Sequence, residues 1–170
     1  ECHEILSMVS RCNAMKLHIS NSNSKIGKIP NMSLVPKVTC PNHHHCSQKP
    51  IGLNCYASKA YKQYPNVRQA WTDNTTLAQS SLAEFKFQLV KYLTKTNKGY
   101  FRIHVAGDFF NQEYLDIWAD VCRDFPHIKF LAFTKSFHLD FSNIPTNLRI
   151  IWSIMPNMPE LANAGSRAYT

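Results

Sequence analysis

The second half of the chain alternates helix-like and strand-like patterns of apolar residues. From Asn74 to about Thr96, apolar residues recur every three or four positions, which predicts an amphipathic helix with Asn74 as its N-cap. The same period recurs over Gln112–Phe125, where Pro126 ends the predicted helix. Runs rich in aromatic and β-branched residues predict three strands, at Tyr100–Val105, Lys129–Thr134 and Leu148–Ile154. Apolar strands separated by helices are typical of a parallel sheet covered by helices, so we expect an α/β fold.

The first third of the chain lacks this periodicity. Leu17–Ser20 predicts a short strand, and Cys55–Tyr64 predicts a helix that Pro65 stops. Between them, Asn21–Asn54 is rich in Asn, Ser and Pro and has no regular pattern. A loop of that length in a compact domain is generally functional or ordered by a ligand. We interpret residues 1–14, which precede Met15, as a leader or added sequence, and residues 15–170 as one α/β domain.

Composition and charge narrow the class of protein. The 170 residues are 44% hydrophobic and 18% charged, as expected for one globular domain. No apolar run of membrane-spanning length and no signal peptide is present, so we expect no membrane partner and a cytoplasmic location. The formal net charge is +8, and no Asp or Glu occurs between Ile5 and Thr72. This asymmetry suits an anionic partner, either nucleic acid, phosphate or an anionic cofactor, and a basic surface that aids solubility is the alternative.

Three cysteines in the irregular segment are candidate metal ligands. Cys40, Cys46 and Cys55 are spaced C-x5-C-x8-C, and the third opens a predicted helix, whose amide dipoles stabilise a thiolate. Three thiolates can hold a 4Fe-4S cluster that leaves one iron free for a ligand. Zinc is the alternative, with one of the three consecutive histidines His43–His45 as fourth ligand. Three reduced cysteines without a metal are the third interpretation, and the spacing does not choose among them.

Polar residues stand where the predicted strands end. Gly107-Asp108, Thr134-Lys135 and Ser153 follow or close the three strands. Ligands of parallel sheets bind at the carboxyl ends of the strands, so we expect these residues to line one site. His104 alternates with Arg102 on the first strand, opposite Ile103 and Val105, and is therefore expected to share the face of Arg102 and to point into the site.

Several sequence blocks together resemble the bacteriophage gene product 88 family. They are NSKIGKIPNMSLVPKVTCP, CYASKAYKQYPNVRQAW followed by Asn74, FRIHVAGDFFNQEYLDIW and FLAFTKS, and they extend over about residues 23–156. Members of the family continue with further cysteines toward the C-terminus. The resemblance therefore implies a phage protein in the host cytoplasm, and a chain that is either a short member or a fragment.

That family in turn resembles a reduced form of the radical S-adenosylmethionine enzymes, which place three cysteines after the first strand of a partial (β/α) barrel. The resemblance implies that Cys40, Cys46 and Cys55 bind three irons of a 4Fe-4S cluster whose fourth iron chelates S-adenosylmethionine. Reduction would then cleave the sulfonium and form a 5′-deoxyadenosyl radical. The x5 and x8 spacings differ from the family's x3 and x2, and Tyr56 follows the last cysteine where the family has an aromatic residue before it.

The same resemblance implies roles for the residues at the strand ends. Gly107 lets the backbone approach the ligand, Asp108 accepts from its ammonium or ribose, and Asp108 and His104 are the candidate catalytic residues. Thr134, Lys135 and Ser153 line the rim of the cofactor site. The expected fold is accordingly a partial (β/α) barrel or an open parallel sheet with a long cysteine-containing loop near the N-terminus.

Two other function classes are consistent with the sequence. One is a zinc-stabilised module that binds nucleic acid, because Lys and Arg alternate with Tyr and Trp between residues 56 and 71. The other is a non-enzymatic phage protein that binds and inhibits a host protein. The sequence names no substrate for the enzyme interpretation.

Overall fold

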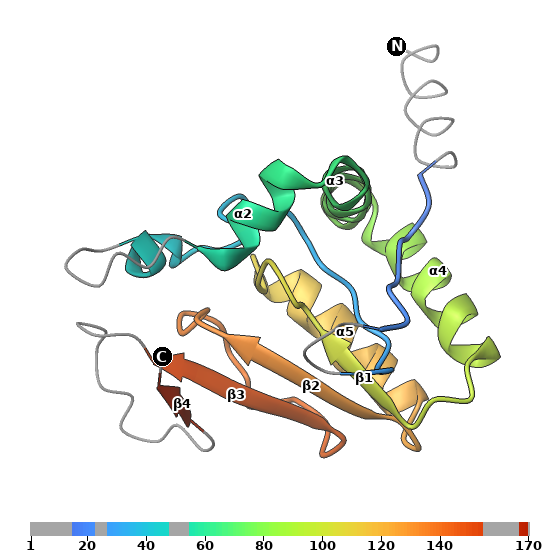
Figure 1. Ribbon diagram of the computed structural model, residues 1–170. Coiled ribbons are helices and arrows are strands. Elements are labelled where there is room, and N and C mark those ends of the chain that lie inside the picture. The colour runs from blue at the N-terminus through green and yellow to red at the C-terminus, as the bar shows by residue number, and fades with distance from the viewer. Residues whose placement is uncertain (1–14, 23–26, 48–54, 155–166, 170) are drawn as a thin grey trace, which may run out of the picture.

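A computed structural model describes residues 15–22, 27–47, 55–154 and 167–169, and all structural statements below concern these residues (Figure 1). The elements in chain order are η1 (His43–Ser47), α2 (Tyr56–Gln63), α3 (Pro65–Ser80), α4 (Leu82–Lys95), β1 (Tyr100–Ile103), α5 (Gln112–Asp124), β2 (Lys129–Thr134), β3 (Leu148–Ile154) and β4 (Arg167–Tyr169).

The strands form one parallel sheet in the order β1-β2-β3-β4. Spatial order equals chain order, and β2 and β3 have the bounds that the apolar runs predict. The α/β class and the open parallel sheet are therefore confirmed. The described strands do not close into a barrel, so the alternative of a partial barrel is not observed.

An extended segment, residues 31–35 between Pro30 and Pro36, continues the sheet beyond β1. The Arg102 amide donates to the Pro30 carbonyl at 2.9 Å, and the Val105 amide donates to the Met32 carbonyl at 3.0 Å. The segment is not a full strand because Pro30 and Pro36, which bracket it, lack the amide hydrogen that a sheet ladder needs. The strand predicted at Leu17–Ser20 is wrong, since among the described residues this segment forms one isolated bridge, from Ser20 to Asn31.

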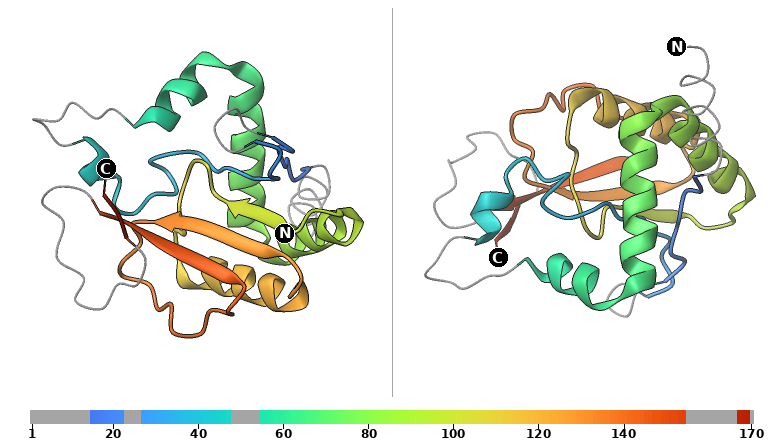
Figure 2. Two further views of the ribbon diagram at one scale, coloured as in Figure 1. Left: turned by 60° about the horizontal axis from the view of Figure 1, so that its bottom comes forward. Right: turned by 90° about the horizontal axis from the view of Figure 1, so that it is seen from above.

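Helices cover one face of the sheet. Phe101, Ile103, Phe130 and Ile150 alternate along the strands toward a core that also contains Trp118 of α5. Figure 2 shows α5 lying against this face. The intervening residues of β1, β2 and β3 lie on the opposite face, and all but the buried Ser153 are half-buried or exposed: Arg102, Leu131, Phe133, Arg149 and Ile151. The sheet thus has a closed face that supplies the core and a more open face.

The helix predicted from Asn74 to Thr96 is in fact parts of two helices. Ser81 breaks it, and its hydroxyl accepts from the Glu84 amide to cap α4. Asn74 is not an N-cap but is buried within α3, where its side chain accepts from the His18 amide and donates to the His18 and Ser33 carbonyls. Asn74 therefore fastens the N-terminal segments to α3. In the described part of the chain, no helix has the length and apolarity needed to cross a membrane.

Candidate functional site

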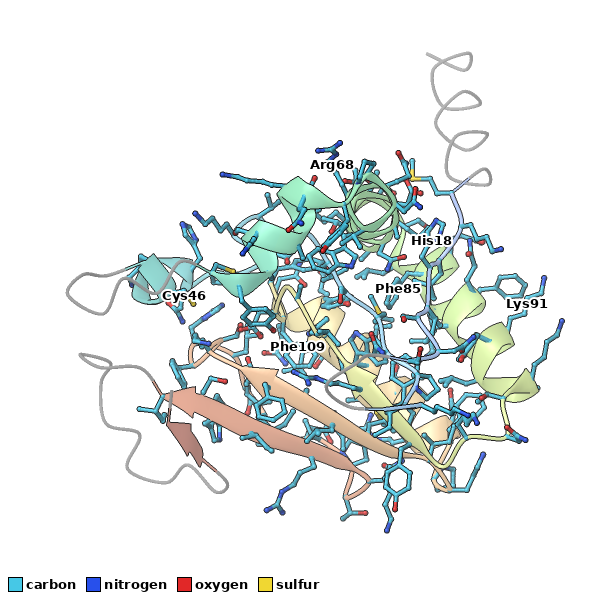
Figure 3. All side chains as sticks on the ribbon, in the orientation of Figure 1. His18, Cys46, Arg68, Phe85, Lys91 and Phe109 are labelled. Atoms are coloured by element: carbon cyan, nitrogen blue, oxygen red, sulfur yellow. The ribbon has the colours of Figure 1, made fainter. Side chains whose placement is uncertain are left out.

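A cavity of about 260 Å³ lies at the carboxyl ends of β1, β2 and β3. Figure 1 shows the arrowheads of these strands pointing toward the side of the molecule where η1 and α2 lie, and Figure 3 labels Cys46 on that side. The cavity collects residues from the cysteine segment, from all three strand ends and from the loop after β1. Its lining includes Cys40, Asn42, His43, Cys46, Cys55, Tyr56, Arg102, His104, Gly107, Asp108, Phe133, Lys135 and Ser153. A wider groove of about 700 Å³, between Met15–Ile19 and α4, contains none of the predicted site residues.

The three cysteines reach this cavity from three local structures. Cys40 ends a turn, Cys46 belongs to η1, and Cys55 is the N-cap residue of α2. All three are half-buried and free of disulfide bonds. Burial raises the pKa of the Cys40 thiol to about 12, and it also raises the pKa of Cys46 above its usual value. Without a metal these two thiols are therefore neutral at pH 7, and a bound cation would displace their protons.

Hydrogen bonds tie the cysteine segment to the sheet. The Asn42 side-chain amide donates to the Lys135 carbonyl, which joins the segment to the end of β2. The Tyr56 hydroxyl donates to the Val105 carbonyl and joins the start of α2 to the end of β1. Within the segment, the His43 amide donates to the Cys40 carbonyl at 3.1 Å. η1 gives part of the predicted loop a helical turn, while residues 48–54 lie outside the described residues, so the predicted long loop is not confirmed.

Gly107 allows two backbone segments to come close together at the cavity. Its φ is +86°, and a Cβ built there would lie 2.6 Å from Leu34 Cβ and 2.7 Å from Thr39 Oγ1. A glycine is therefore required both by backbone conformation and by space. The predicted reason was approach to a ligand, and Gly107 does line the cavity, but the close approach seen is to the segment that leads into Cys40.

Asp108 is a buried carboxylate that joins the ends of β1 and β2. One oxygen accepts from the Thr134 hydroxyl at 2.6 Å and from the Phe109 amide at 2.8 Å, and the other accepts from the Lys135 amide at 2.8 Å. Burial raises its pKa above the usual value, although these hydrogen bonds favour the charged form. Asp108 does not cap the next helix, because Asn111 accepts from the Tyr114 amide to cap α5.

Of the other residues predicted at the strand ends, two line the cavity and one holds Asp108 in place. Lys135 and Ser153 line the cavity, and the Lys135 ammonium lies close enough to Cys46 and Asp108 to act on both electrostatically. Thr134 is not among the lining residues. It is buried, with its hydroxyl directed to Asp108 and accepting from the Ser136 amide, so it supports Asp108.

His104 lies against the core instead of sharing the face of Arg102. Its φ of +55° interrupts the strand alternation, because a left-handed residue turns its side chain away from the pleat. Its imidazole Nε2 is 3.0 Å from the Tyr114 hydroxyl, and its ring stacks on Tyr114. Burial lowers the pKa of His104 to about 3, so it is neutral, and its buried Nδ1 has no hydrogen-bond partner among the described residues. His104 nevertheless contributes to the cavity lining.

Arg102 and Phe133 are cavity residues that the sequence interpretation did not assign. The Arg102 guanidinium carbon lies 4.9 Å from the centroid of the Phe133 ring. One feature of the sequence could have marked Arg102 as a site residue. Arg102 is permanently charged, and the residues on either side of it in the strand are apolar and buried. That pattern is uncommon unless the charge meets a partner.

The thiols of the cavity are its candidate metal ligands. Among the residues described, no three His, Cys, Asp or Glu side chains are arranged to hold one metal ion. In a cubane cluster each thiolate binds a different iron, so the three sulfurs lie farther apart than around one ion. Three free thiols from one segment line one cavity together with Lys135.

The fold and cavity define a mixed α/β protein with an open parallel sheet and a thiol-lined cavity at the carboxyl ends of its strands. Residues 8–164 match the family model described as Gene product 88, and the chain belongs to that family. It is 36% identical over 93 residues to the Gene 88 protein of Mycobacterium phage D29, covering 48% of this chain and 38% of that protein. Over the same length it is 41% identical to the Gene 88 protein of Mycobacterium phage L5, again covering 48% of this chain and 38% of that protein.

The chain thus spans well under half of the length of these curated relatives, with 38% covered in each. No solved structure matches it. The comparisons establish the family and its occurrence in bacteriophages, and they do not support the further likeness to radical S-adenosylmethionine enzymes.

Proposed function

We propose that this chain is a phage-encoded iron–sulfur protein of radical S-adenosylmethionine-like type. In this proposal Cys40, Cys46 and Cys55 hold three irons of a 4Fe-4S cluster, and S-adenosylmethionine binds beside it. The observation that supports the proposal is the convergence of the three cysteines on one cavity with Gly107, Asp108 and Lys135. Cysteines that served only to pack a core would have no reason to meet polar residues at the carboxyl ends of parallel strands.

The protein's own residues would bind and orient the ligand and limit the access of water. When bound and reduced, the cluster supplies the electron that cleaves the sulfonium of S-adenosylmethionine. Lys135 offers a positive charge to the thiolates and to a ligand carboxylate, and it lies within electrostatic reach of Cys46. The Asp108 carboxylate already accepts three hydrogen bonds, two on one oxygen and one on the other. The oxygen that has one donor is therefore the one able to accept from a ligand ammonium or hydroxyl.

Iron and sulfide analysis of protein purified without oxygen tests the cluster. We expect iron and acid-labile sulfide in about equal amounts, with a broad visible absorbance, and we expect both to be lost in Cys40→Ala. Cys122→Ala is the matched control, because Cys122 lies in α5, buried in the core, and is not among the cavity-lining residues. A colourless anaerobic protein with one tightly bound zinc would rule out the cluster, and loss of that zinc in His43→Ala would establish the zinc alternative.

Electron paramagnetic resonance tests the second part of the proposal separately. We expect the spectrum of the reduced cluster to change when S-adenosylmethionine is added, and the change to weaken in Lys135→Ala. A spectrum that S-adenosylmethionine leaves unchanged would refute the radical S-adenosylmethionine-like assignment while keeping the iron–sulfur site.

Nucleic-acid binding is the second candidate function, and one surface favours it. Lys59, Lys62 and Arg68 are exposed on α2 and α3, and no acidic residue occurs from Tyr56 to Thr72. Binding to DNA or RNA would weaken steeply as the salt concentration rises, because each phosphate contact releases counterions. The triple variant Lys59→Gln, Lys62→Gln, Arg68→Gln should then bind nucleic acid more weakly and with a smaller dependence on salt. A triple variant with the affinity and salt dependence of the wild type would rule out nucleic-acid binding at this surface.

A further inference from the structure

The guanidinium of Arg102 is a charged group for which the described residues provide no counterion. Arg102 is half-buried in β1 and lines the cavity. It forms no ion pair with a described residue, and its Nε atom is buried without a hydrogen-bond partner there. A guanidinium keeps its charge in proteins, so it cannot relieve this situation by losing a proton.

The position of this guanidinium is held by packing instead. Its carbon lies 4.9 Å from the centroid of the Phe133 ring on the neighbouring strand. Stacking on an aromatic face leaves the edge of the guanidinium, where its N–H groups point, available for in-plane hydrogen bonds. A planar donor edge that is fixed and lacks an acceptor is suited to a carboxylate or phosphate group.

Arg102 and Lys135 are the two described lining residues of the cavity that carry a permanent positive charge or an ammonium group. Lys135 acts electrostatically on the Cys46 thiol. Arg102 acts electrostatically on Tyr56 and His104, and its guanidinium lies over the Phe133 ring. The cavity is therefore lined by two cationic groups, which come from β1 and from the end of β2.

We infer that Arg102 forms an anion subsite, which binds the carboxylate or phosphate group of a small ligand whose remainder extends toward the cysteines. The Phe133 ring holds the guanidinium in place, and the subsite gives the protein a preference for ligands that carry a negative charge at one end. The inference deepens the proposed function by naming a chemical class for its ligand. It rests on the same cavity but requires no cluster.

Titration of the metal-free full chain with two small anions tests the subsite. Sodium acetate and inorganic phosphate are added at constant ionic strength against chloride, and NMR follows the ¹⁵N–¹H resonance of Arg102 Nε together with the backbone amide resonances of Ile103 and Phe133, which every variant keeps. We expect a saturable shift of these resonances with at least one anion. The affinity measured from the backbone amides should fall at least about tenfold in Arg102→Gln and less in Arg102→Lys, because a charge-assisted hydrogen-bond pair is lost. Tighter acetate binding indicates a carboxylate ligand, and tighter phosphate binding indicates a phosphate ligand.

Arg149→Gln is the matched control. Arg149 lies on the same face of the sheet and is joined to Arg102 by register through Leu131, but it is exposed and outside the cavity. Its substitution should leave anion binding unchanged. Saturable binding that Arg102→Gln retains at full strength, or an Arg102 resonance that shifts with neither anion, overturns the inference.

The triple variant Cys40→Ala, Cys46→Ala, Cys55→Ala separates this inference from the proposed function. We expect it to lose iron and keep the anion-dependent shift of Arg102. If neither the wild type nor the triple variant contains iron and both bind the anion, the cluster is refuted and the subsite stands. Iron-containing protein with no anion-dependent shift would refute the subsite and leave the cluster.

Discussion

Replacement of Gly107 by alanine tests the close approach that brings the Cys40 segment to the sheet. An added Cβ meets Leu34 Cβ at 2.6 Å and Thr39 Oγ1 at 2.7 Å, and the first contact cannot be relieved by rotating a flexible side chain. The backbone φ of +86° adds a second cost, since an L-residue is strained there. Strain of this kind costs about 1–2 kcal/mol and overpacking about 1–3 kcal/mol, so we expect the free energy of unfolding to fall by about 2–5 kcal/mol.

Two other glycines separate the two costs. Gly27 has a φ of +73°, and no described residue lies within 4 Å of an added Cβ, so Gly27→Ala should show the backbone strain alone, about 1–2 kcal/mol. Gly99 has neither a positive φ nor a close neighbour, so Gly99→Ala should change stability by no more than about 1 kcal/mol in either direction. Urea unfolding followed by tryptophan fluorescence measures all three variants.

The relative loss of unfolding free energy in the three variants shows whether the close approach at Gly107 holds the Cys40 segment in place. The excess of Gly107→Ala over Gly27→Ala is the cost of collision with the segment from Leu34 to Thr39. If Gly107→Ala destabilises the protein no more than Gly27→Ala does, the segment yields freely. Gly107 would then not hold the position of Cys40.

Three further predictions concern single buried residues. His104 is neutral in the folded protein, with its pKa lowered to about 3 by burial, so stability should be full above pH 6.5 and decline by up to about 1.4 kcal/mol per pH unit as the pH falls toward 3. His104→Gln should flatten that slope in urea titrations, and an unchanged slope would assign the acid sensitivity elsewhere. The Asp108 pKa is raised above 3.8 by burial, so this group stabilises the fold most at low pH and less as the pH rises through its folded pKa. Asp108→Asn should remove this opposite trend and, by leaving a buried donor without its acceptor, cost about 1–3 kcal/mol at pH 7 in chemical denaturation. Asn74→Ala removes three hydrogen bonds to the N-terminal segments and should lower the free energy of unfolding by about 2–4 kcal/mol. Asn66 is exposed on the same helix, so Asn66→Ala should change stability little. Equal melting temperatures of the two variants would contradict the role of Asn74.

Part of the candidate site could be predicted from the chain order alone. The residues after parallel strands must gather at one edge of the sheet, so Gly107-Asp108, Lys135 and Ser153 were expected to lie together, and they line one cavity at that edge. The spacing of Cys40, Cys46 and Cys55 also marked them as one group, because residues so near in sequence readily reach one point. All three line the cavity that the strand ends form.

Local pattern by itself determined the parallel α/β class, the bounds of β2 and β3 and the helix α5, because each depends on periodicity within a few residues. Only the tertiary structure decided which segment lies beside β1, that Asn74 joins chain segments instead of capping a helix, and that His104 leaves the face of Arg102. These features depend on contacts between residues far apart in sequence, or on which face of the sheet the helices cover. The finding that no described residue forms an ion pair with Arg102 is of the same kind, since a sequence shows that a residue is charged but not whether an opposite charge faces it.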